Sequence, residues 1–204
     1  MTIPELYEKL NSPSFMDPKD GDLFYNYYIY QYPAEKEYEI RQEIIDFKAN
    51  LIRPSTYVDV LTLNLFDEFC KYLDQTKFLK NPSMLQFLLD KEKKKPESAA
   101  NVESTLSRTA NSEGFIRYIH QRIMEHKAKD DHYKRPYVFV NGVGGMYPYL
   151  RVNNFLTLYE NFNKTDEYKI LVFYPGHHEN NSYKLFGVLP DNHTYRATLL
   201  VNQD

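Results

Sequence analysis

The residues of this chain best suited to chemistry are glycines that follow apolar segments. Gly142, Gly144 and Gly145 come directly after the apolar run 137–140. Glycine between a strand and a helix lets a phosphate group approach backbone N–H groups at the helix N-terminus, which is the chemistry of a dinucleotide site. The spacing therefore raises the hypothesis of a nucleotide-binding protein.

The pattern departs from the dinucleotide fingerprint at two positions. Tyr147 stands where the fingerprint requires Gly or Ala. The acidic residue expected about 20 positions later should end the next strand, whereas Glu160 lies in a predicted helix. Gly-Lys followed by Ser or Thr does not occur, so a standard phosphate-binding P-loop is absent. A degenerate nucleotide-binding switch stays an alternative to a tight strand-to-helix turn.

Histidines in the last third raise the hypothesis of a metal site. His177, His178 and His193 lie near Glu179 and Asp191 in the sequence, and imidazole and carboxylate groups bind several divalent ions. Adjacent histidines on a strand point to opposite faces, so His177 and His178 could share an ion only on a loop. We interpret the segment as a polar loop, with a metal-dependent nuclease as a third hypothesis, and expect neither a metal nor a cofactor.

The sequence offers no convincing nucleophile. It has no Gly-x-Ser-x-Gly elbow, and its single cysteine, Cys70, lies beside Phe66, Phe69 and Leu73 at helical spacing, on a predicted core face. One cysteine also excludes an internal disulfide and a zinc cage built from cysteines. We therefore expect a protein that is not an enzyme.

Arginines near aromatic residues indicate a contact surface. Arg151 and Arg196 each follow aromatic residues, and guanidinium groups stack on rings while pairing with carboxylates or phosphates. An internal ion pair with Glu160 or Asp191 is an equal alternative. The candidate partner- or ligand-binding residues are Gly142, Gly144, Gly145, Tyr147, Pro148, Arg151, Tyr174, Pro175, Gly176 and Arg196.

The composition is that of a globular protein rich in tyrosine. The 204 residues are 42% hydrophobic and include 19 Tyr, 13 Phe and no Trp, so the rings serve the core, a partner surface or both. The formal charge of −3 provides no strong field for nucleic acid, and we expect no autonomous nucleic-acid binding. Without a signal segment or a long apolar run, the chain is expected to be cytoplasmic and to avoid membranes.

The order of periodic segments predicts an α/β fold. A β-prone segment at 27–32 precedes an amphipathic helical pattern at 40–51, and a second β-prone segment at 57–63 precedes another helical pattern at 66–73. Repeated strand and helix imply parallel pairing with right-handed crossovers. We predict a single α/β domain over 1–204, with a mostly parallel central sheet flanked by helices in three Rossmann-like layers.

Two segments lie outside this repeat. Residues 1–26 are predicted to form an N-terminal arm, and residues 76–130 a helical insert. Within the insert we predict a long helix over 99–127 with Gly114 as an interruption. The lysine-rich run 91–95 ends a shorter helix. Lysines can contact phosphates, but at a helix end before a proline we interpret the run as a solvated terminus that complements the macrodipole.

The last third is predicted to contain one helix and three extended segments. The helix starts at Pro148 and runs through 155–162, and the next strand ends at Tyr174. Segments 182–188 and 194–201 are predicted strands joined by a turn at Pro190–Asn192.

The glycine loops follow strands 137–140 and 169–173. In an open α/β sheet, loops that leave the carboxyl ends of the strands bind ligands or partners. We therefore expect Gly144 and Pro175 to lie at the same edge of the sheet.

Four blocks of the last third resemble the BrxB family of the BREX bacteriophage-exclusion systems. They are Asn141-Gly-Val-Gly-Gly-Met-Tyr-Pro-Tyr-Leu-Arg151, Leu171-Val-Phe-Tyr-Pro-Gly176, Leu185-Phe-Gly187 and Asp191-Asn-His-Thr-Tyr-Arg-Ala197. The strand and helix pattern over 27–73 is similar too. Family members commonly carry an acidic residue, an aromatic residue and Asp-Gly after the second block, where this chain has His177-His-Glu-Asn-Asn181.

The resemblance implies a small, non-catalytic adaptor of a defence complex. It implies docking onto the phosphatase-like protein PglZ, beside the methyltransferase PglX and the large ATPase BrxC, in phage restriction and host DNA methylation. It supplies no catalytic residues.

Overall fold

The strands of the central sheet bury both of their faces. The computed structural model describes residues 1–16, 27–51, 60–129, 137–162, 167–179, 182–191 and 197–200. In β3 (Tyr137–Asn141), Val138 and Val140 enter one hydrophobic core, whereas Tyr137 and Phe139 enter another. Since alternate residues of a strand share a face, this burial explains the continuous apolar run.

The described strands form a mostly parallel sheet, as predicted. Its order is β2–β3–β4–β1–β7, with every neighbouring pair parallel. These strands are β1 (Tyr27–Tyr32), β2 (Val60–Asn64), β3, β4 (Lys169–Glu179) and β7 (Thr198–Leu199). Past Pro175, β4 continues as an antiparallel partner of β5 (Ser182–Leu185), which pairs with β6 (Leu189–Asp191).

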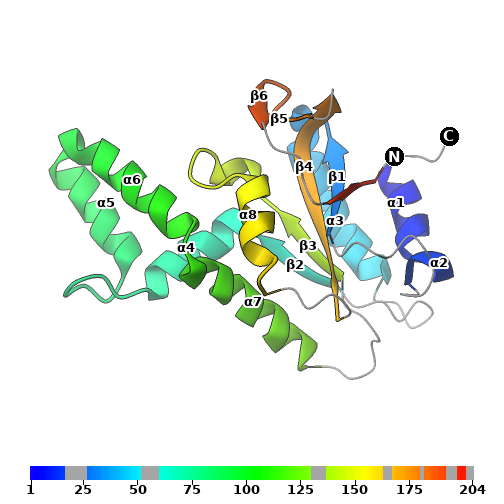
Figure 1. Ribbon diagram of the computed structural model, residues 1–204, viewed down its shortest axis with the longest axis horizontal. Coiled ribbons are helices and arrows are strands. Elements are labelled where there is room, and N and C mark those ends of the chain that lie inside the picture. Colours follow the sequence, from blue (N-terminus) through cyan, green and yellow to red (C-terminus); the bar gives the residue numbers. More distant parts are fainter. Residues whose placement is uncertain are drawn as a thin grey trace.

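Helices cover both faces of the sheet, which gives the predicted three layers (Figure 1). One face packs against α1 (Ile3–Leu10), α2 (Pro13–Met16) and α3 (Glu37–Leu51), the last preceded by the 3-10 helix η2 (Ala34–Lys36). The other face packs against α4 (Leu65–Gln75), α7 (Glu113–Lys127) and α8 (Val152–Tyr159). The segment predicted as an N-terminal arm thus begins with a helix that buries Leu6 and Leu10 in the core.

Much of the tyrosine surplus lies in the core. The face under α1 to α3 is lined by rings, such as Phe139 and Phe173, whose centroids lie 5.3 Å apart in a T-shaped contact. The buried tyrosines are Tyr27, Tyr28, Tyr30, Tyr32, Tyr137, Tyr159, Tyr168, Tyr174 and Tyr183.

The helical insert contains more breaks than predicted. It comprises α5 (Met84–Lys94), the 3-10 helix η3 (Pro96–Ser98), α6 (Ala99–Ala110) and α7. The prediction of one helix over 99–127 interrupted at Gly114 was wrong, because the break falls at Asn111 and Ser112. The Ser112 hydroxyl accepts a hydrogen bond from the Phe115 N–H and caps α7, whereas Gly114 lies in its first turn.

The last third also departs from the predicted boundaries. The chain forms a 3-10 helix, η4 (Gly144–Met146), and α8 starts at Val152 rather than Pro148, because Arg151 is extended (φ −94°, ψ 150°). β4 continues past Tyr174 to Glu179. The hairpin turn lies at 186–188, where Phe186 (φ 55°) and Gly187 (φ 76°) adopt left-handed conformations, and Pro190 belongs to β6.

Some predicted features fall outside the described residues. These are Arg196, His193, residues 57–59 of the second predicted strand and residues 17–26 of the predicted arm. None of the helices in the described ranges combines the length and apolar character that a transmembrane span requires.

Candidate functional site

The two glycine loops meet at the carboxyl edge of the sheet. Gly144 follows β3, and Pro175 lies at the end of the parallel part of β4. A Cβ atom built on Gly144 would lie 2.7 Å from the Phe186 ring and 3.4 Å from Cγ of Pro175. Gly144 and Pro175 therefore lie side by side, as expected.

Gly142 joins the first loop to the start of α4. Its φ is +68°, and an added Cβ would lie 2.2 Å from Oδ1 of Asn64. That oxygen caps α4 by accepting hydrogen bonds from the N–H groups of Phe66 (3.1 Å) and Asp67 (3.2 Å). Gly142 is thus required by a left-handed backbone and by close packing against a helix cap.

Three N–H groups of the glycine loop form hydrogen bonds within the loop. Gly145 donates to the Gly142 carbonyl (3.1 Å), Met146 to the Val143 carbonyl (3.2 Å) and Tyr147 to the Gly144 carbonyl (3.2 Å). A phosphate cradle needs such groups directed at the ligand. These three groups are used inside η4 and are not directed at a ligand.

The Arg151 side chain lies on the surface of this edge. Its guanidinium carbon lies 5.1 Å from the centroid of the Tyr147 ring, and its Nη1 donates to the Pro190 carbonyl at 3.0 Å. Both side chains are half-buried, whereas Pro148 is exposed. The contact between the Arg151 guanidinium and an aromatic ring, expected from the sequence, is therefore present. Among the described residues Arg151 forms no ion pair, so the alternative, an internal pair with a carboxylate, is not observed there.

Some of the candidate residues are buried. Tyr174 is 1% exposed and packs against Tyr183 with ring centroids 5.4 Å apart, so its side chain belongs to the core and is not an exposed anchor. Gly142, Pro175 and Gly176 are buried as well. A Cβ on Gly176 would lie 2.1 Å from the Lys184 carbonyl oxygen, so this glycine permits close contact between β4 and β5.

Two exposed phenylalanines at this edge were not predicted. Phe66 and Phe186 are each 40% exposed, and a Cβ on Gly145 would lie 3.3 Å from the Phe66 Cβ. Helical spacing had placed Phe66 on a core face, and the Phe186 segment was interpreted as a strand. We define the carboxyl-edge surface as Phe66, Gly144, Gly145, Tyr147, Arg151 and Phe186.

A groove of about 380 Å³ continues from this surface. Its lining includes Tyr32, Pro33, Gly176, His177 and Phe186. It lies at the carboxyl ends of β1 and β4, which are neighbours in the parallel sheet. The carboxyl ends of the strands are where open α/β sheets bind ligands.

The histidines of this region are separated. Nε2 of His177 lies 3.9 Å from Glu179, whereas the His178 ring lies 4.7 Å from the Tyr183 ring centroid. Among the described residues no group of three His, Cys, Asp or Glu side chains is placed to hold a metal ion.

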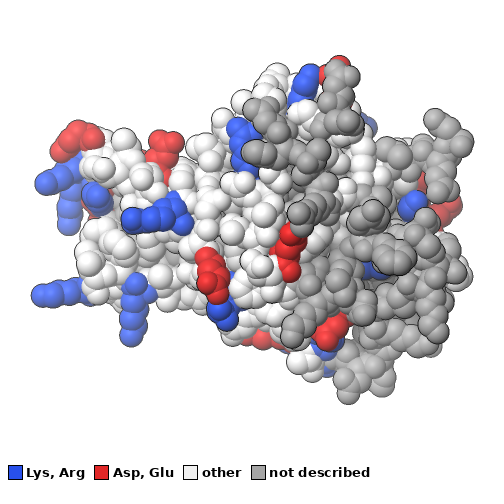
Figure 2. Space-filling view, viewed as in Figure 1, with Lys and Arg blue, Asp and Glu red and all other residues white. Residues whose placement is uncertain are grey.

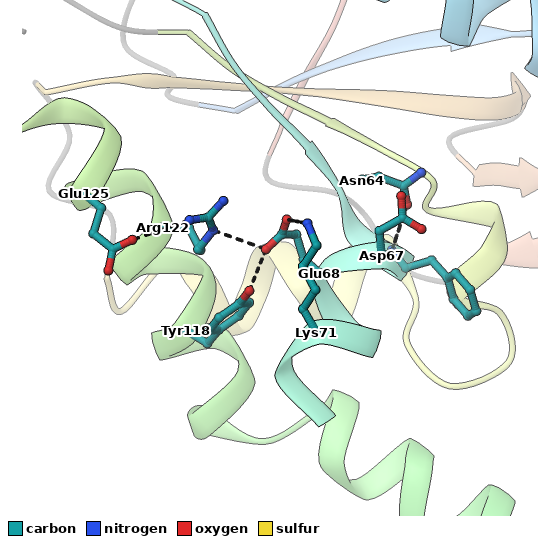
Figure 3. Close-up of polar contacts among 8 residues, drawn as sticks. Asn64, Asp67, Glu68, Lys71, Tyr118, Arg122 and Glu125 are labelled. Atoms are coloured by element: carbon teal, nitrogen blue, oxygen red, sulfur yellow. Dashed lines mark hydrogen bonds and ion pairs between the residues drawn. The ribbon is translucent and has the colours of Figure 1, made fainter. Parts of the chain in front are cut away.

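A second polar cluster, not predicted from the sequence, joins α4 to α7 (Figure 3). Glu68 is 4% exposed and points from α4 toward Tyr118 and Arg122 on α7. Its carboxylate accepts hydrogen bonds from the Tyr118 hydroxyl (2.7 Å) and Lys71 Nζ (2.8 Å), and Nε of Arg122 lies 3.3 Å away. The only sequence signal was an acidic residue beside an apolar helical stripe.

These contacts keep Glu68 ionised. Burial raises the pKa of Glu68, but the hydrogen bonds from Lys71 and Tyr118 and the charges of Lys71 and Arg122 outweigh it, so this pKa lies below its ordinary value. Burial, with the hydrogen bond to Glu68 and its charge, raises the pKa of Tyr118 to about 12. The cluster therefore anchors α7 of the helical insert to α4 and leaves Glu68 with no proton to exchange near neutral pH.

The fold and this edge define a three-layer α/β protein that exposes aromatic side chains where such sheets bind ligands or partners. Residues 61–200 match the family model described as "BREX protein BrxB", and the chain belongs to the BrxB family. It is 25% identical to the BREX protein BrxB of Bacillus cereus (strain H3081.97) over 204 residues, which cover 98% of this chain and 96% of that protein. No solved structure matches. Membership of a BREX family associates the chain with antiviral defence by bacteriophage exclusion.

Proposed function

We propose that this protein is a non-catalytic adaptor of a BREX phage-defence complex and that it docks a PglZ-like component through the carboxyl-edge surface. The observation that carries the proposal is the exposure of Phe66 and Phe186 beside the stacked Arg151. Aromatic residues and arginine are enriched among the anchors of protein interfaces. PglX-like and BrxC-like components are further partners of the same assembly.

The packing of this surface supports a docking role. The Phe186 ring rests against Gly144 and Phe66 against Gly145, so backbone without side chains lies between two exposed rings. The adjoining groove offers space for a side chain of the partner. Binding energy concentrated in a few such anchors amounts to about 2 kcal/mol or more for each.

Co-expression with the PglZ-like protein tests the proposal. We expect a binary complex by size-exclusion chromatography, and a roughly 30-fold weaker affinity for Phe186→Ala or Arg151→Ala, which is about 2 kcal/mol. Ile45→Ala is the matched control, because Ile45 is 60% exposed on α3 and lines neither the carboxyl-edge surface nor the adjoining groove. Two separate peaks at micromolar concentration, or equal affinities for all three variants, would count against the proposal.

Phage plating and host DNA methylation test the role in defence directly. In cells that carry the complete defence operon, Phe186→Ala should restore phage plating and reduce host DNA methylation, whereas Ile45→Ala should change neither. Full restriction by the Phe186→Ala variant would remove this surface from the defence function.

A nucleotide-binding switch is the second candidate, because the groove lies at the carboxyl ends of two parallel strands. Saturating ligand at about 100 times its dissociation constant adds about 2.7 kcal/mol of stability. A nucleotide panel that leaves the thermal unfolding temperature unchanged would eliminate this candidate.

A further inference from the structure

The charges of this chain are unevenly distributed along the sequence. The helical insert, residues 76–130, contains eleven Lys and Arg and seven Asp and Glu, a formal charge of +4, which leaves −7 for the remainder. The net charge of −3 is the sum of these two opposite charges. Charge asymmetry between parts of one chain is typical of proteins that contact nucleic acid.

Six cations of the insert lie on or next to α5. We define the lysine arm as α5 with its flanking residues, which carry Lys77, Lys80, Lys91, Lys93, Lys94 and Lys95. Lys91 is half-buried and the others are exposed. Within the described part of the chain none of the six forms an ion pair, whereas on α7 Arg117 pairs with Glu113 and Lys127 with Glu167.

The lysine arm projects from the body of the protein. α5 packs against α4 and α6, and α5 and α6 together form the end of the molecule opposite α1 (Figure 1). Figure 2 shows blue side chains reaching outward at this end of the molecule, with a smaller number of red ones. A long polyanion can therefore contact the lysine arm without approaching the acidic body.

We propose that the lysine arm binds the phosphate backbone of double-stranded nucleic acid, without sequence preference. The eleven residues of α5 span about 16 Å. A duplex carries one charge per about 1.7 Å of its axis, so this length faces about nine phosphates. Lysine ammonium groups act as point charges on phosphates, and the arm carries no arginine fork of the kind that reads base edges.

Anisotropy of a labelled 20-base-pair DNA duplex titrated with the full chain tests the proposal. If four lysines contact phosphates, the salt slope is about −3.6, and Kd rises on the order of 100-fold between about 50 and 200 mM salt. Lys93→Gln/Lys94→Gln should reduce that slope by about 2 and weaken binding at least tenfold at the lower salt concentration. The control Lys9→Gln/Lys36→Gln removes the same charge from the body.

Three results would overturn the proposal: no change in anisotropy at the lower salt concentration, equal effects of the two double variants, or binding of poly-glutamate as tight as that of DNA. The last result would assign the arm to an acidic protein partner. Affinity for the PglZ-like protein tests the proposed function independently of DNA binding, because the lysine arm and the carboxyl-edge surface share no residue. The Lys93→Gln/Lys94→Gln variant should retain it.

Discussion

Replacing Glu68 with glutamine should destabilise the protein by about 2 kcal/mol. The buried side chain would lose its charge while Tyr118, Lys71 and Arg122 keep their donors directed at it. Breaking a fully buried ion pair costs about 3–5 kcal/mol. Here the side chains of Lys71 and Arg122 are 60% and 38% exposed, so water compensates part of the loss, and the remaining loss is about that of one charged hydrogen bond.

Urea unfolding of wild type and Glu68→Gln at several pH values measures this contribution. Because folding lowers the pKa of Glu68, the stabilisation is complete above the unfolded value of about 4.3 and is lost as the pH falls through the folded pKa. The two free energies of unfolding should therefore differ by about 2 kcal/mol near pH 7 and converge in acid.

The matched control is Glu113→Gln. Glu113 pairs with Arg117 on the surface, with side chains 71% and 67% exposed, so its loss should cost at most about 0.5 kcal/mol. Equal stability of Glu68→Gln and Glu113→Gln at pH 7 would refute the reasoning, as would a Glu68→Gln difference that persists unchanged to pH 3.

Gly142→Ala should cost about 2–3 kcal/mol in urea unfolding, because its left-handed φ of +68° disfavours a side chain and its Cβ displaces the Asn64 cap. Gly145→Ala, at an exposed position without a left-handed φ, should cost less than about 1 kcal/mol, and equal losses would contradict the assignment. Lys169→Met should cost about 1–2 kcal/mol, since the buried ammonium group donates to the Phe15 carbonyl and lies 4.1 Å from the centroid of its ring. An unchanged urea midpoint in Lys169→Met would show that these contacts contribute nothing net.

The periodicity of apolar residues and the apolar content of each segment predicted most of the sheet and its flanking helices. The runs 137–140 and 169–173 are buried on both faces, which is the arrangement that continuous apolar strands favour. The placement of β1 between β4 and β7, away from β2, depends on contacts between distant segments and leaves no local signal.

The wrong predictions arose where one local feature of the sequence outweighed another, or where the deciding contact lay far away in the sequence. Gly114 is a helix breaker by intrinsic propensity, but the Ser112 cap next to it determined where α7 begins. Phe186 adopts φ of 55°, which an aromatic residue rarely does, so the sequence indicated a strand where the chain turns. Lys71 lies three residues after Glu68 on the same helix, but the other two partners, Tyr118 and Arg122, come from α7, and their contacts with Glu68 leave no local signal.

Each glycine of the carboxyl edge is placed so that another side chain can approach it, and this suggests a test that separates docking from stability. A Cβ on Gly144 would lie 2.7 Å from the Phe186 ring, which is 40% exposed and free to move outward. Gly144→Ala should therefore change the free energy of unfolding by less than about 1 kcal/mol.

The displaced ring would no longer present the surface that a partner recognises, so affinity for the PglZ-like protein should fall about tenfold or more, as expected when a preorganised anchor is lost. The control is Gly114→Ala, which has its own close contact, 2.5 Å from the Tyr72 hydroxyl, but lies on α7 outside the carboxyl-edge surface. If Gly144→Ala binds the partner as tightly as Gly114→Ala does, the position of Phe186 has no part in docking, and the glycines of this edge serve packing alone.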